Sequence, residues 1–164
     1  MSNTDYPTLF ESCTPRGDVL DGTLQEDQFA ASLATVAHAP DDAAPVYRDA
    51  REFFDMTYPT DGLKTLLSNL TGRFLESGGY DGGEYSNSIL CLDTRFGGGK
   101  THDLIASYHL ATDPGKVQNL DEHLNDGDEE LASTYQDAAV ARGLNVDTAV
   151  FVGGHVDAQS ARSS

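Results

Sequence analysis

Residues 90–111 read LCLDTRFGGGKTHDLIASYHLA, and this stretch decides how the rest of the chain is interpreted. It starts with an apolar run, passes through three consecutive glycines into Lys-Thr, and ends in a helical pattern. A phosphate-binding loop has this order, because glycines let backbone N–H groups curl around a phosphate and the following helix favours the anion. The stretch therefore raises the hypothesis of a nucleotide-binding loop.

The residues of this loop have separate expected roles. Three glycines would surround phosphate with backbone N–H groups, Lys100 would meet the β- and γ-phosphates of ATP, and Thr101 would hold the Mg²⁺ of the nucleotide. His102 follows at the start of the helix, where it either touches phosphate or has only a structural role. The loop departs from the common GxxxxGKT pattern, because Thr94 stands where the first glycine belongs. The expected nucleotide-binding residues are Gly97, Gly98, Gly99, Lys100, Thr101 and His102.

The patterns around the loop predict an α/β fold. Ser88–Leu92 is a short, continuous apolar run, which is typical of a strand buried on both faces. A helix is expected over 101–111, a second helix over 129–142, and a second strand at Ala149–Val152. The expected fold is a partial nucleoside-triphosphatase domain in the order strand, phosphate loop, helix, helix, strand. The side chains expected to point inward from the first helix are Leu104, Ile105, Tyr108 and Leu110.

Helical patterns precede this domain. Helices are expected over 24–39, 47–56 and 61–76, and the last begins after Thr60, a good N-cap. Its apolar stripe consists of Leu63, Leu66, Leu67, Leu70 and Phe74. The expected organisation is an N-terminal helical region (1–77), a glycine-rich surface loop (78–87), the start of the nucleotide-binding domain (88–158) and a tail (159–164).

The chain is strongly acidic, with 27 acidic and 10 basic residues and a formal net charge of −17. This balance excludes a basic surface for nucleic acid, so direct binding of DNA or RNA is not expected. Three explanations of the charge remain: adaptation to a cytoplasm rich in salt, an acidic interaction tail, and metal binding. The acidic residues are spread along the whole chain, which disfavours the tail and favours adaptation to salt, as in a halophilic archaeon.

The sequence predicts neither secretion nor a membrane location. Its first residues lack the positive and apolar regions of a signal peptide, and no apolar run approaches the roughly 18 residues of a membrane span. A cytoplasmic location is therefore expected. Cys13 and Cys91 fit no CxxC spacing, and His102 and His109 are seven residues apart instead of the four of a helical zinc pair. Neither pair predicts a metal site.

Three blocks of the sequence carry a resemblance to a known family. They are CTPRGDVLDGTLQEDQFAASLATV (13–36), YRDAREFFDMTYPTDGLKTLL (47–67) and LDTRFGGGKTHDLIASYHLA (92–111). In this order they resemble the opening of large predicted P-loop ATPases of archaea and bacteria that carry the domain of unknown function numbered 499. The resemblance extends from about Cys13 to Val156. It implies an AAA+-like ATPase that uses ATP and Mg²⁺, and association with the remaining ATPase domains or a homologous subunit.

Two functions stay open at this level. After Thr101 no apolar strand ends in the acidic pair that an ATPase of this class uses to activate water, so enzyme activity is uncertain. The first hypothesis is an ATP-binding N-terminal part of a P-loop ATPase that does not hydrolyse ATP by itself. The alternative is a truncated remnant or a non-catalytic interaction module that docks onto a complete ATPase.

Overall fold

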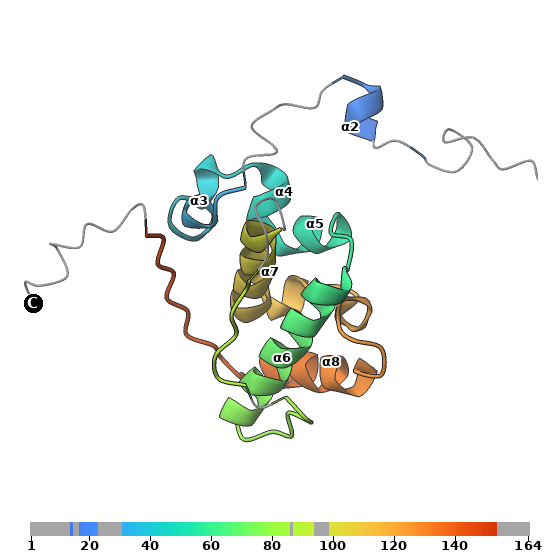
Figure 1. The fold of residues 1–164 in the computed structure, drawn as a ribbon, viewed down its shortest axis with the longest axis vertical. Coiled ribbons are helices and arrows are strands. Elements are labelled where there is room, and N and C mark those ends of the chain that lie inside the picture. Colours follow the sequence, from blue (N-terminus) through green and yellow to red (C-terminus); the bar gives the residue numbers. More distant parts are fainter. Residues whose placement is uncertain (1–13, 15–16, 23–30, 86, 94–98, 154–164) are drawn as a thin grey trace, which may run out of the picture. The chain divides into compact units, whose positions relative to one another are not determined.

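A computed structural model describes residues 14, 17–22, 31–85, 87–93 and 99–153 (Figure 1). The chain divides into two units, Met1–Ala30 and Ala31–Ser164. In the first unit, the described helix is the single turn α2 (Gly17–Leu20). The second unit contains the helices described below and the candidate site.

The predicted α/β fold is wrong, because the described residues form helices and contain no strand. Ser88–Leu92 and Ala149–Val152, which were expected to be strands, have no regular secondary structure. Ile89 is 88% exposed and Phe151 is 81% exposed, so neither run is buried on both faces. A strand requires a neighbouring strand for its backbone N–H and C=O groups, and an apolar run says nothing about whether that neighbour exists. In the part of the chain that the structure describes, neither run has one.

The first predicted helix is shorter than its pattern suggests. Helix α3 (Leu33–His38) begins after Ser32, which has an extended backbone and a hydroxyl that accepts the N–H three residues on at 3.2 Å. A continuous helix over 24–39 is therefore wrong at Ser32, and its earlier part, 23–30, lies outside the described residues. A 3₁₀ turn, η2 (Pro40–Asp42), follows, since proline is well placed to begin a new turn.

The second predicted helix, 47–56, is two helices. Helix α4 (Pro45–Arg48) ends at Asp49, whose backbone is extended, and α5 (Ala50–Asp55) begins directly after it. The Asp49 carboxylate accepts the N–H groups two and three residues on, at 3.0 and 3.4 Å. An N-cap of this kind starts a new helix and so accounts for the break.

The third predicted helix is confirmed. Helix α6 (Asp61–Ser77) follows Thr60, whose hydroxyl accepts the Leu63 N–H at 3.3 Å. The expected stripe faces the core, where Leu63, Leu66 and Leu67 are buried and Leu70 and Phe74 are partly buried. The period of 3.6 residues therefore identified the buried face of this helix correctly.

Helix α7 (Lys100–Thr112) confirms the helix expected after the glycines. Ile105 and Leu110 are buried and Tyr108 is partly buried, as expected. Leu104 is instead 43% exposed, so its predicted inward position is wrong. The two short 3₁₀ turns that follow α7 are η3 (Pro114–Lys116) and η4 (Leu120–His123).

The last predicted helix, 129–142, is present in two forms. Helix α8 (Glu129–Gln136) continues without a break into the π-helix η5 (Asp137–Ala141). Gly143 then takes a positive φ of 76°, a backbone conformation that glycine adopts readily and that ends the helix.

The core of the second unit lies where α6 packs against α7 and α8 and where α5 packs against α7 (Figure 1). Buried polar atoms tie these helices together. The Tyr135 hydroxyl of α8 donates to the Leu110 carbonyl of α7 at 2.8 Å. The largest fully buried apolar side chains are Tyr135, Phe53, Phe54, Leu67, Leu75, Ile105, Leu110, Leu120, Leu124 and Val117.

Two glycines bring the backbone of α6 against the glycine-rich segment that follows it. A Cβ atom added to Gly72 would lie 2.5 Å from the Gly82 carbonyl oxygen and 2.6 Å from the Tyr85 Cβ. Gly82 is buried, although it belongs to a stretch predicted to be a surface loop. The close contact holds Tyr85 beside α6, where its hydroxyl can reach the end of another helix.

Candidate functional site

The glycine cluster leads directly into helix α7. Gly97 and Gly98 lie outside the described residues, and the structure takes up the chain again at Gly99. Gly99 is the N-cap of α7 and has a left-handed backbone, with φ 79° and ψ 4°. Because a glycine has no side chain, the N-cap position offers no group to accept the first N–H groups of the helix. The helix of 13 residues therefore begins at an end that suits an anion.

Lys100 and Thr101 form the first turn of α7 with His102. Thr101 is exposed to solvent and Lys100 is half-buried. Asp103 completes the turn, and its carboxylate oxygen lies 3.9 Å from the point where a Cβ on Gly99 would be. An acidic side chain here stabilises the positive end of the helix.

The His102 side chain lies against α5 and against Thr57, which comes two residues after the end of that helix. Its Nε2 atom is 2.9 Å from the Thr57 hydroxyl, and its ring centroid is 4.5 Å from that of Phe53. Burial lowers the pKa of His102, and the Asp103 carboxylate partly opposes that shift. Burial likewise raises the pKa of Asp103, and His102 opposes it. The neutral form of the His102 ring is therefore favoured. Its two contacts, Thr57 and Phe53, lie more than 40 residues earlier in the chain.

Sequence reasoning did not find Thr57, Phe53 or Asp103 as members of this site. Asp103 carried a local signal, because an acidic residue in the first turn of a helix is a common feature. Thr57 and Phe53 carried none, since each is at least 40 residues from the glycines and their contact arises only when α5 packs on α7.

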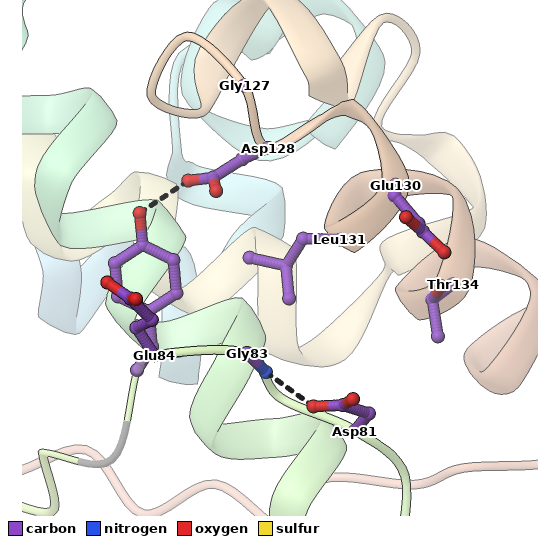
Figure 2. A pocket seen from close by; sticks show the side chains of 9 residues that line it. Asp81, Gly83, Glu84, Gly127, Asp128, Glu130, Leu131 and Thr134 are labelled. Carbon is purple, nitrogen blue, oxygen red and sulfur yellow. Dashed lines mark hydrogen bonds between the residues drawn. The ribbon is translucent and has the colours of Figure 1, made fainter.

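A separate pocket of about 410 Å³ lies between the segment after α6 and the start of α8 (Figure 2). None of the described residues that line it is basic, and none comes from α5 or α7. We call it the acidic pocket, and it is lined by Asp81, Gly83, Glu84, Tyr85, Gly127, Asp128, Glu130, Leu131 and Thr134.

Asp128 is a carboxylate of the acidic pocket that accepts hydrogen bonds from two side-chain hydroxyls. One of its oxygens accepts the Tyr85 hydroxyl at 2.6 Å and the Ser68 hydroxyl at 2.7 Å. The Tyr85 oxygen also accepts the side-chain amide of Asn125 at 3.0 Å. These bonds tie α6, the segment after it and the start of α8 together. The role of Asp128 is therefore structural, since its hydrogen bonds join neighbouring segments of the fold.

The described residues contain neither a metal-binding cluster nor a membrane-spanning helix. No group of three or more His, Cys, Asp or Glu side chains among them could hold a metal ion. His109 instead donates from Nε2 to the Tyr47 carbonyl at 2.8 Å and lies beside Phe53. Within the described part of the chain, no helix is long and apolar enough to cross a membrane. Cys91 is a free, exposed thiol, and Cys13 lies outside the described residues.

The comparisons with known proteins give a family. The model of the DUF499 N-terminal domain matches residues 9–159. The chain belongs to the DUF499 family. The resemblance carried by the three sequence blocks is therefore confirmed at the level of the family. No curated protein matches the chain, and no solved structure matches it.

Proposed function

We propose that this chain binds the phosphate groups of a nucleoside triphosphate, ATP with Mg²⁺, at the N-terminal end of α7. The glycines 97–99 supply backbone N–H groups, Lys100 meets the terminal phosphates, and Thr101 holds the Mg²⁺ that the nucleotide brings. Phosphate binding at a helix N-terminus depends on N–H groups and the helix dipole, so it does not require a sheet beside the loop.

The observation that carries this proposal is the junction at Gly99. A left-handed glycine precedes the helix immediately, so the chain enters α7 from a glycine cluster with a lysine and an exposed threonine in the first turn. Each of these features has a separate reason to be present at a phosphate site, and here they occupy consecutive positions. Asp103 stabilises the same helix end when no anion is there.

The acidic pocket is a poor alternative for the same ligand. A triphosphate carries several negative charges, and the pocket is lined by four carboxylates with no basic residue among its described lining. Repulsion between like charges would oppose the ligand there. The electrostatics therefore favour the end of α7 that carries Lys100.

We further propose that this segment is the nucleotide-binding part of an ATPase and that the acidic surface adapts it to concentrated salt. The net charge of −17 supports the second point, because high salt screens the repulsion that such a charge causes. The chain is not expected to hydrolyse ATP by itself, since the sequence offers no acidic pair in the position where an ATPase activates water. ATP turnover well above that of a Lys100→Ala variant would contradict this point.

The binding proposal is tested by calorimetry with Mg-ATP in concentrated KCl. Lys100→Ala is expected to weaken binding at least about tenfold, because it removes a charge-assisted contact to phosphate. The matched control is Lys116→Ala near the opposite end of α7, where the ammonium lies 3.6 Å from each of two carboxylates, Asp49 and Asp113. Equal affinity in the wild type and Lys100→Ala, or equal loss in both variants, would contradict the proposal.

A second candidate is a non-catalytic module that docks onto another copy of the chain or a homologous ATPase subunit. The observation that favours it is the exposure of two large apolar side chains, Ile89 and Phe151, on segments without regular structure. Burying such side chains at a protein contact would remove apolar surface from water, which is favourable. Sedimentation velocity over a range of concentrations should then show association that Phe151→Lys removes. A monomer at every concentration would count against self-association.

A further inference from the structure

We propose that His102 is a positioning residue of the nucleotide site and not a ligand of phosphate. Its hydrogen bond to Thr57 and its ring contact with Phe53 hold the first turn of α7 on α5. The inference rests on the proposed function, because the site that His102 positions is the phosphate site at this helix end. The affinity of the loop for nucleotide then depends on Thr57, which lies outside the loop.

The direction of the Thr57–His102 hydrogen bond follows from the other bond of the threonine. The Thr57 hydroxyl lies 2.6 Å from the Phe53 carbonyl oxygen, which only accepts, so the single hydroxyl proton is donated there. The hydroxyl oxygen must then accept from His102, which places a proton on Nε2. The Nε2 atom is thus occupied by Thr57 and does not serve as a donor to phosphate.

The ring of Phe53 reinforces this arrangement. Phe53 is 1% exposed, and its ring contacts His102 at 4.5 Å and His109 at 5.4 Å between centroids. The two histidines are seven residues apart, two turns along the same face of α7. Phe53 therefore contacts that face at two places, and the helix cannot turn about its axis without losing one of the contacts.

Fixing His102 also fixes the two residues before it. Successive residues of an α-helix point about 100° apart, so while His102 faces α5 the preceding Thr101 is turned to solvent. The observed burial agrees, since Thr101 is exposed and His102 is partly buried. Loss of the hydrogen bond would let this first turn fray, and Lys100 and Thr101 would lose their set directions.

The test compares variants of Thr57 and His102 in the full chain, with Mg-ATP as the probe. Thr57→Val keeps the shape and removes the acceptor, and Thr57→Ser is the matched control that keeps it. His102→Leu removes the donor, and His102→Gln keeps an N–H donor at the end of the side chain. Thr57→Val and His102→Leu are expected to weaken binding about three- to tenfold, the range that one hydrogen bond contributes.

The double variant Thr57→Val/His102→Leu is expected to bind little more weakly than either single variant, because both remove the same bond. If His102 instead bound phosphate directly, Thr57→Val would keep wild-type affinity and only the His102 substitutions would weaken binding. Histidine ring NMR of the chain without nucleotide should also show the proton on Nε2 of His102, and this signal should change in Thr57→Val.

The outcomes separate this inference from the proposed function. If Lys100→Ala weakens binding and Thr57→Val does not, the nucleotide site stands and the positioning role of His102 is overturned. If the wild type and Lys100→Ala bind equally or not at all, the proposed function fails, and the positioning role fails with it. Near-wild-type affinity in both His102→Gln and Thr57→Ser supports the positioning role. A general loss of folding would not separate the variants that keep the hydrogen bond from those that remove it.

Discussion

The contact between Gly72 and the segment after α6 predicts opposite effects for the same substitution at two places on one helix. In Gly72→Ala the new Cβ would meet the Gly82 carbonyl oxygen at 2.5 Å and the Tyr85 Cβ at 2.6 Å. Both distances are below what real Cβ atoms show, and one of the neighbours is backbone. The segment that carries Tyr85 must therefore move away from α6. In Gly62→Ala the new Cβ would meet nothing within 4 Å.

The expected magnitudes follow from two opposing effects. Replacing glycine with alanine inside a helix stabilises it by up to about 1 kcal/mol. Overpacking costs about 1–3 kcal/mol, and two severe contacts place Gly72 near the upper end of that range. The free energy of unfolding should thus fall by about 2 kcal/mol in Gly72→Ala and rise by up to about 1 kcal/mol in Gly62→Ala. For a chain of this length a loss of 2 kcal/mol lowers Tm by about 4–8 °C.

The assay is thermal and urea unfolding of both variants beside the wild type in concentrated KCl. Displacement of Tyr85 should also disturb its 2.6 Å hydrogen bond to Asp128, which the Tyr85 ring signals in an NMR spectrum would report. If Gly72→Ala is as stable as Gly62→Ala, the close approach of the two backbones is refuted. If it is unstable while the Tyr85 signals stay unchanged, the destabilisation does not act through this contact.

Two further predictions concern titration and the acidic pocket. Burial lowers the pKa of His102 and His109 in the folded state, so the unfolded chain binds more protons below about pH 6.5. The stability that these neutral rings contribute should be complete above about pH 6.5 and be lost as the pH falls, and urea titrations should show a flatter pH dependence in His109→Gln. An equally steep dependence in that variant would contradict the assignment. Tyr85→Phe removes a hydrogen bond to Asp128 and should cost about 1–2 kcal/mol in urea unfolding, whereas Tyr58→Phe at an 83% exposed position should cost nothing measurable.

The candidate site was predictable only in its local part. The glycines, Lys100 and Thr101 are consecutive in the chain, so the pattern that suggests phosphate binding could be recognised without a fold. The role now proposed for His102 could not be derived this way, because its partners lie far away in the chain, Phe53 in α5 and Thr57 just after that helix. The same holds for the acidic pocket, where Asp128 meets Tyr85 across 43 residues of chain.

The sequence by itself determined the family and the helices that have strong local signals. Helix α6 is an example, since its N-cap at Thr60 and its apolar period act between residues within a few positions of each other. Only the tertiary structure decided the fate of Ser88–Leu92 and Ala149–Val152, which resemble strands in composition. Strand formation depends on pairing with a distant segment, and no such pairing occurs among the described residues. Packing of α5 on α7 likewise decided what His102 touches, because a contact between helices depends on the whole fold.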